Sequence, residues 1–147
     1  MPRTVIVVPC FNEGKRFSPE AFRSFARQWT EGEFLLVNDG STDNTLHILK
    51  ALEESMPGIV TALDLPRNLG KAEAVRHGFV QAFESGPDYV GFWDADLATP
   101  LEALPLFEAV FREKSTIEMG VMLTLFPTSN APSPESRNLS GPTPPVF

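Results

Sequence analysis

Short apolar runs alternate with amphipathic helical patterns along the first 114 residues, and this alternation limits the choice of fold more than any other feature. The first run, residues 5–8, is apolar at every position, which is typical of a strand buried on both faces. Further strands are predicted at 34–37, 59–65 and 89–93, with helices between them. Strands and helices in alternation predict an α/β fold with a mostly parallel, doubly wound sheet and helices on both faces.

Two of the predicted helices carry start signals. Ser18 before Pro19 is the pattern of an N-cap and a first helical residue, and apolar side chains at helical spacing continue to Trp29. Thr99, with an acidic residue three places later, has the spacing of a capping box and predicts a helix start. Pro105 is expected to delay or kink that helix.

Polar clusters follow all four predicted strands, at residues 9–14, 38–43, 67–71 and 94–96. Right-handed crossovers in a parallel sheet place the carboxyl ends of its strands along one edge. Ligands of such sheets bind outside that edge. Four polar clusters on one edge therefore predict a binding site.

Asp94 and Asp96 are the first candidate pair. Two carboxylates two residues apart after a buried strand can reach one ligand if the chain turns there, and their oxygens suit Mg²⁺ or Mn²⁺. Such a cation neutralises the charge that develops on a diphosphate leaving group. The alternative is a pair of solvated carboxylates at a strand end.

Asp39 and Lys71 are candidates for contacts with a nucleotide. A carboxylate at a strand end can accept an N–H from a base while Asp43 caps the next helix, and a turn with capping chemistry alone is the alternative. Lys71 follows Gly70 near a predicted helix start, which favours phosphate binding. Arg76 lies in the same predicted helix, where a solvated arginine is the alternative.

Phe11 and Glu13 follow the first predicted strand. The ring of Phe11 can stack on a base and Glu13 can accept a hydrogen bond, whereas a core position is the alternative for Phe11. Cys10 is predicted to be a small buried hydrophobic residue, because no motif around it activates a thiol.

The composition excludes several classes of function. The 12 basic and 19 acidic side chains leave a net charge of −7, so the basic surface of a nucleic-acid-binding protein is absent. A single cysteine excludes an internal disulfide framework and a cysteine-rich zinc site. The sequence has no run of 18 apolar residues, and its first apolar run is too short for a signal peptide. We therefore expect a cytoplasmic protein, with a peripheral place at the membrane left open.

Four motifs together resemble those of family 2 glycosyltransferases with the GT-A fold. They lie at residues 5–13, 36–45, 68–72 and 94–100, in the family's order and spacing, and the resemblance covers about residues 4–113. The Asn-x-Gly-Lys pattern with Asp-Ala-Asp looks most like the branch that contains dolichyl-phosphate glucose and mannose synthases and their bacterial relatives.

The resemblance implies a nucleotide-sugar site with a divalent metal ion, Mg²⁺ or Mn²⁺. Phe11 stands where the family usually has tyrosine, so ring stacking is kept and the hydroxyl is lost. The resemblance implies a base contact for Asp39, a ribose or sugar contact for Asp94 and a metal contact for Asp96, with Asp94 as a second metal ligand. The residues implied in donor binding are Pro9, Phe11, Asn12, Glu13, Asp39, Gly40, Ser41, Asn68, Lys71, Arg76, Asp94, Ala95 and Asp96.

The reaction implied is transfer of a sugar, with inversion, from UDP or GDP to an acceptor, with a polyprenyl phosphate as one candidate. We expect residues 1–126 to form a truncated GT-A domain with a fifth strand at 116–126, and the Pro- and Ser-rich residues 127–147 to be disordered or extended. The acceptor site and the general base are expected outside this chain, so weak or absent catalysis is expected of the chain alone. An uncovered sheet edge favours a homo-oligomer.

Two other interpretations stay open at this stage. One is a non-catalytic nucleotide-binding fragment, or a pseudoenzyme that binds a partner chain. The other is a phosphatase of the haloacid dehalogenase type, because Asp94-Ala95-Asp96 is similar to its Asp-x-Asp-x-Thr motif. Thr99 comes one place too late for that motif, and the two aspartates do not follow the first strand.

Overall fold

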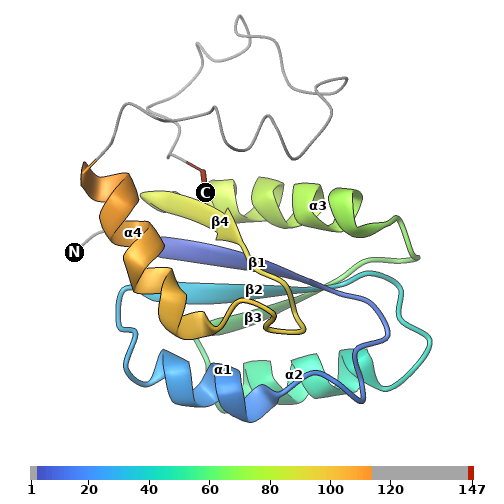
Figure 1. Cartoon of the computed structure of the whole chain (residues 1–147). Helices are drawn as coiled ribbons and strands as arrows, with labels where there is room; N and C mark the ends of the chain where they lie inside the picture. Colours follow the sequence, from blue (N-terminus) through green and yellow to red (C-terminus); the bar gives the residue numbers. More distant parts are fainter. Residues whose placement is uncertain (1–2, 114–145) are drawn as a thin grey trace, which may run out of the picture.

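The computed structural model describes residues 3–113 and 146–147. In this part of the chain four parallel strands form one sheet in the order β3-β2-β1-β4 (Figure 1). The strands are β1 (Thr4–Cys10), β2 (Gly32–Asn38), β3 (Val60–Asp64) and β4 (Tyr89–Phe92). The parallel sheet predicted from the apolar runs is confirmed.

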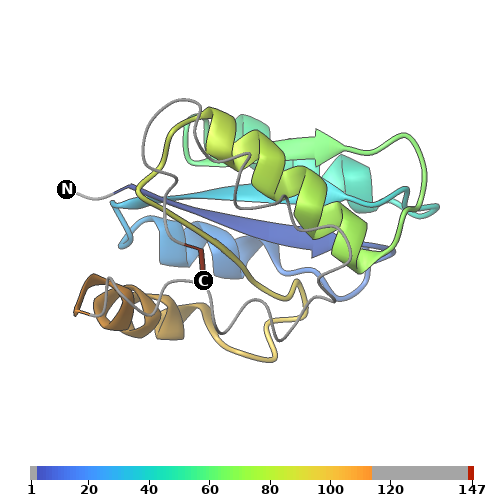
Figure 2. The ribbon, with the colours of Figure 1, turned by 90° about the horizontal axis from the view of Figure 1, so that it is seen from above.

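Helices cover both faces of the sheet, as predicted for a doubly wound fold. α1 (Pro19–Ala26) and α2 (Thr45–Ser55) lie below the sheet in Figure 1, and α3 (Lys71–Glu84) lies above it. Figure 2, seen from above, shows α3 running over the strands. A short 3-10 turn, η1 (Leu101–Ala103), leads into α4 (Leu104–Glu113), whose first residue is buried in the core on the α1 side.

The side chains of β1 divide between two cores. Ile6 and Val8 belong to the core on the α1 and α2 side, and Val5 and Val7 belong to the core under α3. All four side chains are at most 4% exposed. The strand is apolar at every one of these positions because helices cover it on both faces.

Aromatic rings fill the core between α1 and the sheet. Phe22 of α1 meets Phe34 of β2 edge-on, with 5.1 Å between ring centroids, and Trp29 packs on Phe34 at the same separation. The indole N–H of Trp29 donates to Glu108 across 3.3 Å, which ties α4 to this core. α1 ends at Ala26, before the predicted apolar stripe ends, yet Trp29 is still buried.

One predicted helix start is confirmed and the other is wrong. The hydroxyl of Ser18 caps α1, and Pro19 is its first residue. Thr99 caps no helix, because η1 intervenes with Pro100 at its cap position. The backbone carbonyl of Thr99 accepts the indole N–H of Trp93. Pro105 is the second residue of α4, where its missing N–H breaks no helical bond, so the predicted delay of this helix is confirmed.

The last two residues of the chain pair with part of the outer edge of β4. Val146 forms a parallel bridge with Val90, and the N–H of Phe147 donates to the carbonyl of Val90 across 2.8 Å. The N–H of Phe92 donates to the carbonyl of Phe147 across 3.2 Å. Self-association of the chain stays a prediction.

Two expectations concern residues that the structure does not describe. The predicted fifth strand at 116–126 and residues 127–145 of the predicted tail lie outside the described residues. Among the described helices, none has the length and apolar character needed to cross a membrane.

Residue 78 must be glycine because α3 lies very close to the sheet. A Cβ atom at Gly78 would stand 2.3 Å from Cγ1 of Val7 and 3.1 Å from Cγ2 of Val37 in the strands beneath. Both valines are fully buried, and a close-packed core gives them little room to move. The missing side chain therefore sets the distance between α3 and the sheet.

Gly78→Ala is expected to lower the free energy of unfolding by about 1–3 kcal/mol, because overpacking outweighs the better helix propensity of alanine. Chemical denaturation measures the difference. Val80→Ala, on the exposed side of the same helix, is the control and should change it by less than about 1 kcal/mol. Equal effects of the two substitutions would contradict the close packing.

Candidate functional site

The order of the strands places a crevice at the carboxyl ends of β1 and β4. The chain passes from β1 to β2 to β3 and then crosses back to β4 on the other side of β1. Ligands of doubly wound sheets bind where the strand order reverses in this way. A cleft of about 350 Å³ lies there, within the usual size of small-molecule sites. Its walls come from the loops after all four strands and comprise Pro9, Cys10, Phe11, Glu13, Asp39, Asn68, Gly70, Lys71, Asp94, Ala95 and Asp96.

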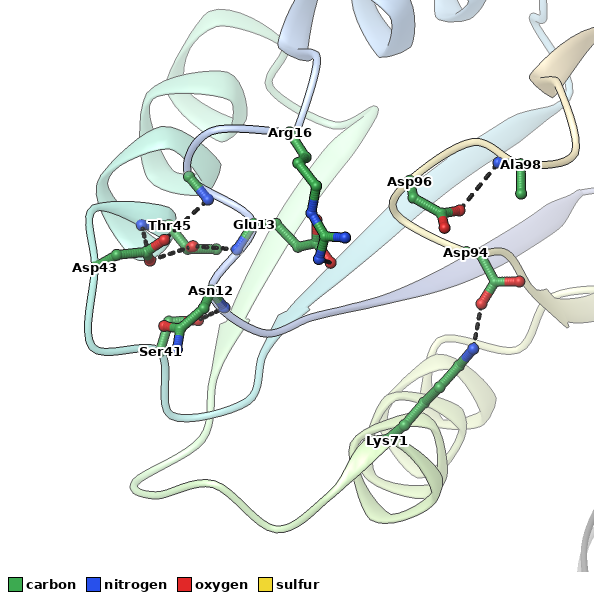
Figure 3. Close-up of polar contacts among 11 residues, drawn as sticks. Asn12, Glu13, Arg16, Ser41, Asp43, Thr45, Lys71, Asp94, Asp96 and Ala98 are labelled. Atoms are coloured by element: carbon green, nitrogen blue, oxygen red, sulfur yellow. Dashed lines mark hydrogen bonds and ion pairs between the residues drawn. The ribbon is translucent and has the colours of Figure 1, made fainter.

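Lys71 and Asp94 form an ion pair at this cleft (Figure 3). Lys71 is the first residue of α3, and Asp94 is the second residue after β4. The ammonium group donates to Oδ1 of Asp94. The two side chains are 61% and 47% exposed, so water screens the pair and it adds little to stability. Its importance lies in holding a cation and a carboxylate over one cleft.

The loop after β4 turns sharply, which keeps both acidic side chains at the cleft. Leu97 has a φ of +55°, and its N–H donates to the carbonyl of Asp94 across 3.1 Å. Oδ1 of Asp96 accepts the N–H of Ala98 across 3.0 Å. Trp93 begins the loop, and its buried indole donates to a backbone carbonyl at the far end of the loop across 2.8 Å.

The pair Asp94 and Asp96 fits a hard divalent cation as a partial ligand set, since both side chains present carboxylate oxygens to one cleft. Within residues 3–113 and 146–147, no group of three or more His, Cys, Asp or Glu side chains is placed to hold a metal ion. The described residues therefore offer two protein ligands. A bound phosphate and water would supply the remaining oxygens, as is usual for Mg²⁺.

Phe11 and Glu13 form the wall of the cleft at the end of β1. Phe11 is 45% exposed, so it is not a core residue and its ring can face a planar ligand. Oε1 of Glu13 accepts from Arg16 across 3.0 Å. Its other oxygen, Oε2, is buried and has no hydrogen-bond partner in the described part of the chain. A ligand that donates to this oxygen would recover the free energy that such burial costs.

Asn12, Gly40, Ser41 and Arg76 do not line the cleft as the structure describes it, whereas the other nine of the thirteen predicted donor-binding residues do. The N–H of Asn12 donates to Oγ of Ser41 across 3.0 Å, which joins two neighbouring loops. Arg76 donates to Glu73 across 3.0 Å on the surface of α3. For these residues the structure shows contacts within the protein.

Asp43 joins the loop after β1 to the start of α2 (Figure 3). Its Oδ2 accepts the N–H of Gly14 across 3.0 Å, and its Oδ1 accepts the N–H of Thr45 across 2.9 Å. The N–H of Glu13 donates to the hydroxyl of Thr45 across 2.9 Å. Asn44 holds the cap position but its side chain makes no cap hydrogen bond, so the carboxylate of Asp43, one residue earlier, caps the helix as predicted. The hydrogen bond from the Thr45 side chain is the main cause that lowers the pKa of Asp43.

Cys10 and Gly70 line the cleft although neither is among the residues implied in donor binding. Cys10 is fully buried, and burial raises the pKa of its thiol, so it is a wall residue and not a nucleophile. Gly70 holds the cap position before α3 with a φ of +95°. For Cys10 the only sequence signal is that it adjoins residues predicted for the site, whereas Gly70 belongs to the segment predicted to bind phosphate.

A second hollow, of about 280 Å³, lies at the opposite, amino ends of the strands. Among the residues around it, Arg3 and Glu33 already form an ion pair at 2.6 Å. These charges neutralise each other, so the cleft at the carboxyl ends is the better candidate for a functional site.

Comparison with known protein families assigns the chain to one of them. The model of the family described as Glycosyl transferase family 2 matches residues 5–138, which include every loop of the cleft and all four strands except the first residue of β1. The chain belongs to glycosyltransferase family 2. The resemblance inferred from the four motifs is confirmed.

Two curated relatives of this family 2 chain act on polyprenyl phosphates, as their names state. A dolichyl-phosphate beta-glucosyltransferase of Trichomonas vaginalis is 34% identical over 122 residues, which cover 78% of this chain and 35% of the relative. An undecaprenyl-phosphate 4-deoxy-4-formamido-L-arabinose transferase of Serratia proteamaculans is 38% identical over 111 residues, with coverage of 74% and 33%. The chain spans about a third of the length of these relatives.

Solved structures of glycosyltransferases share the fold of this chain. TarS of S. aureus in complex with UDP-GlcNAc matches with a TM-score of 0.61 and 27% identity, over 77% of this chain and 32% of that chain. The mannosyltransferase PcManGT of Pyrobaculum calidifontis, in complex with GDP-Man and Mn²⁺, matches with a TM-score of 0.53 and 22% identity, over 74% and 31%. The predicted GT-A fold class is confirmed.

The lowered pKa of Asp43 predicts a pH-dependent contribution to stability. A carboxylate whose pKa is lowered by folding stabilises the protein fully above its unfolded pKa, and this contribution is lost as pH falls through its folded pKa. Asp43→Asn is therefore expected to have a lower Tm than the wild type at neutral pH. The difference should narrow below about pH 4, as Asp43 becomes protonated in the wild type.

Thermal melts of both proteins from neutral pH to about pH 3 measure this difference. Glu54→Gln, at an exposed position of α2, is the control and should track the wild type throughout. A difference between Asp43→Asn and the wild type that stays constant over the whole pH range would contradict the prediction.

Proposed function

We propose that this chain forms the donor side of an inverting glycosyltransferase site. The cleft binds the nucleoside diphosphate of a UDP- or GDP-sugar, and the sugar passes to an acceptor of the polyprenyl phosphate class. The observation that carries the proposal is that Lys71, Asp94 and Asp96 meet in one cleft at the switch point of a family 2 chain.

Lys71 and the N-terminus of α3 supply a positive potential for the diphosphate. α3 begins at Lys71, and within the described residues no side chain caps this end of the helix. Backbone N–H groups of the first turn are then left for an anionic ligand. This local cation matters because the chain as a whole carries a net charge of −7. A phosphate oxygen would compete with Asp94 for the ammonium group.

Asp94 and Asp96 would hold Mg²⁺ or Mn²⁺ at the same end of the cleft. When bound, the cation neutralises the charge that develops on the departing diphosphate. The partial exposure of the Asp94 side chain supports this assignment. Its carboxylate can exchange the ammonium group of Lys71 for a metal ion without leaving a buried position.

Phe11 and Glu13 suit the nucleoside. The half-exposed ring of Phe11 offers a flat surface on which a base can stack. The buried Oε2 of Glu13 would accept a hydrogen bond from a ribose hydroxyl. The complex of TarS with UDP-GlcNAc supports a nucleotide sugar as the ligand class.

The acceptor class is supported by the two curated relatives, whose names contain dolichyl phosphate and undecaprenyl phosphate. In an inverting transfer the acceptor oxygen attacks the anomeric carbon opposite the diphosphate, and the new bond forms as the bond to the diphosphate breaks. Holding donor and acceptor in line accounts for much of the catalysis in such a reaction. We therefore propose that the reaction takes place at the surface of a membrane, with the chain on its cytoplasmic side.

Titration of the purified chain with UDP, UDP-glucose, GDP and GDP-mannose, with and without Mn²⁺, tests the proposal. One base is expected to be preferred, and omission of Mn²⁺ should weaken binding by roughly tenfold or more, because the diphosphate charge is then left unneutralised. Asp96→Asn should lose this dependence on Mn²⁺.

Asp88→Asn is the matched control, because it makes the same change of charge at the amino end of β4, where Asp88 accepts the backbone N–H of Arg3. It should bind like the wild type. If a chain that is folded by circular dichroism binds none of the four nucleotides, the proposed donor site is wrong and only the fold stands.

A further inference from the structure

The carboxylate of Asp39 is hydrogen-bonded to the loop between β3 and α3. Its Oδ1 accepts the N–H of Leu69 across 2.7 Å, and its Oδ2 accepts the N–H of Gly70 across 3.0 Å. The side-chain amide of Asn68 donates to Oδ2 across 3.2 Å and to the backbone carbonyl of Asp39 across 3.1 Å. One residue thus contacts three consecutive positions of a loop about thirty residues away in the sequence.

Burial makes these hydrogen bonds strong and leaves Asp39 little capacity for others. The residue is 2% exposed, and a buried carboxylate is costly unless donors surround it. Hydrogen bonds to an ionised group are stronger than neutral ones. A carboxylate accepts about four hydrogen bonds, and the loop supplies three of them.

Gly40 shows that the two loops approach each other along their backbones. It has a φ of +63°, and a Cβ atom there would stand 2.1 Å from the backbone nitrogen of Asn68 and 2.3 Å from the carbonyl carbon of Arg67. No side chain fits between the loops at this point. Asp39 and Gly40 therefore act on the same short segment, one by hydrogen bonds and the other by close contact.

The segment that Asp39 holds leads directly into the start of α3. Gly70 is the cap residue of this helix, and Lys71, the next residue, is the cation of the cleft. We infer that Asp39 is a positioning residue, which fixes residues 68–70 so that Lys71 and the first N–H groups of α3 face the diphosphate. The inference rests on the proposed donor function, but whether Asp39 holds residues 68–70 in place can be tested without any ligand.

A positioning role of Asp39 and a contact of Asp39 with the base predict different changes in ligand affinity when the residue is replaced. If Asp39 serves the base alone, its loss should weaken only the nucleotide that is preferred, and inorganic pyrophosphate should bind as before. If Asp39 fixes the loop, its loss should weaken UDP, GDP and pyrophosphate by a similar factor, because all three contain the diphosphate.

The experiment is amide hydrogen exchange by NMR on the ligand-free chain, followed by titration with the three probes. In Asp39→Asn the amides of Leu69 and Gly70 are expected to exchange at least about tenfold faster, because one acceptor oxygen becomes an N–H₂ donor and the other loses its negative charge. The matched control is Asp64→Asn, which makes the same change of charge at the end of β3, where Asp64 accepts from Asn38 across 2.8 Å. The control should leave both amides unchanged.

Asn68→Ala covers the case in which Asp39→Asn fails to fold. It removes one donor and leaves the two backbone hydrogen bonds to the carboxylate, so a smaller acceleration of the same two amides is expected. Unchanged exchange in Asp39→Asn overturns the inference, as does unchanged exchange in Asn68→Ala where only that variant folds. A loss of affinity confined to one nucleotide also overturns it.

Failure of the proposed function would look different. In that case the wild type itself would bind none of the three probes, while the exchange of Leu69 and Gly70 would still decide whether Asp39 holds the loop.

Discussion

The burial of β1 between two strands and two helical layers is the constraint on which the rest of the structure depends. Its side chains enter both cores, so the chain must send helices to both faces of the sheet. To do so it returns past β1 to form β4 on the far side, and this reversal opens the crevice at the carboxyl ends. The cleft is a consequence of covering one fully apolar strand, and its polar loops are free to carry chemistry.

The four loops of the cleft are linked side by side through polar contacts. Asn12 joins the first loop to the second through Ser41, and Asp39 joins the second loop to the third. The pair of Lys71 and Asp94 joins the third loop to the fourth. The links made by Asn12 and Asp39 use backbone N–H groups. The link between Lys71 and Asp94 is a half-exposed ion pair, which a charged ligand disturbs most easily.

The sequence predicts well what depends on local pattern and poorly what depends on distant partners. The strands, the cap at Ser18 and the acidic pair after β4 follow from periodicity and neighbouring residue types. Thr99 is no cap because η1, with Pro100 at its own cap position, lies between it and α4. Two of the donors to Asp39 are backbone N–H groups of a loop that is distant in the sequence. Every residue except proline has such a group, so no residue pattern can reveal this contact. A donor-binding role for Arg76 stays a prediction; its ion pair with Glu73, three residues earlier on the same helix, follows a spacing that the sequence shows.

The two tryptophans of the chain occupy contrasting places. Trp29 is buried in the core against Phe34, and its indole N–H donates a hydrogen bond to Glu108 of α4. The indole of Trp93 closes the loop that carries both acidic side chains of the cleft, and it meets the ring of Phe107 edge-on at 5.6 Å. A ligand that moves this loop would alter the surroundings of the Trp93 indole. The protein thus contains an intrinsic fluorophore in the loop that carries both acidic side chains of its own cleft.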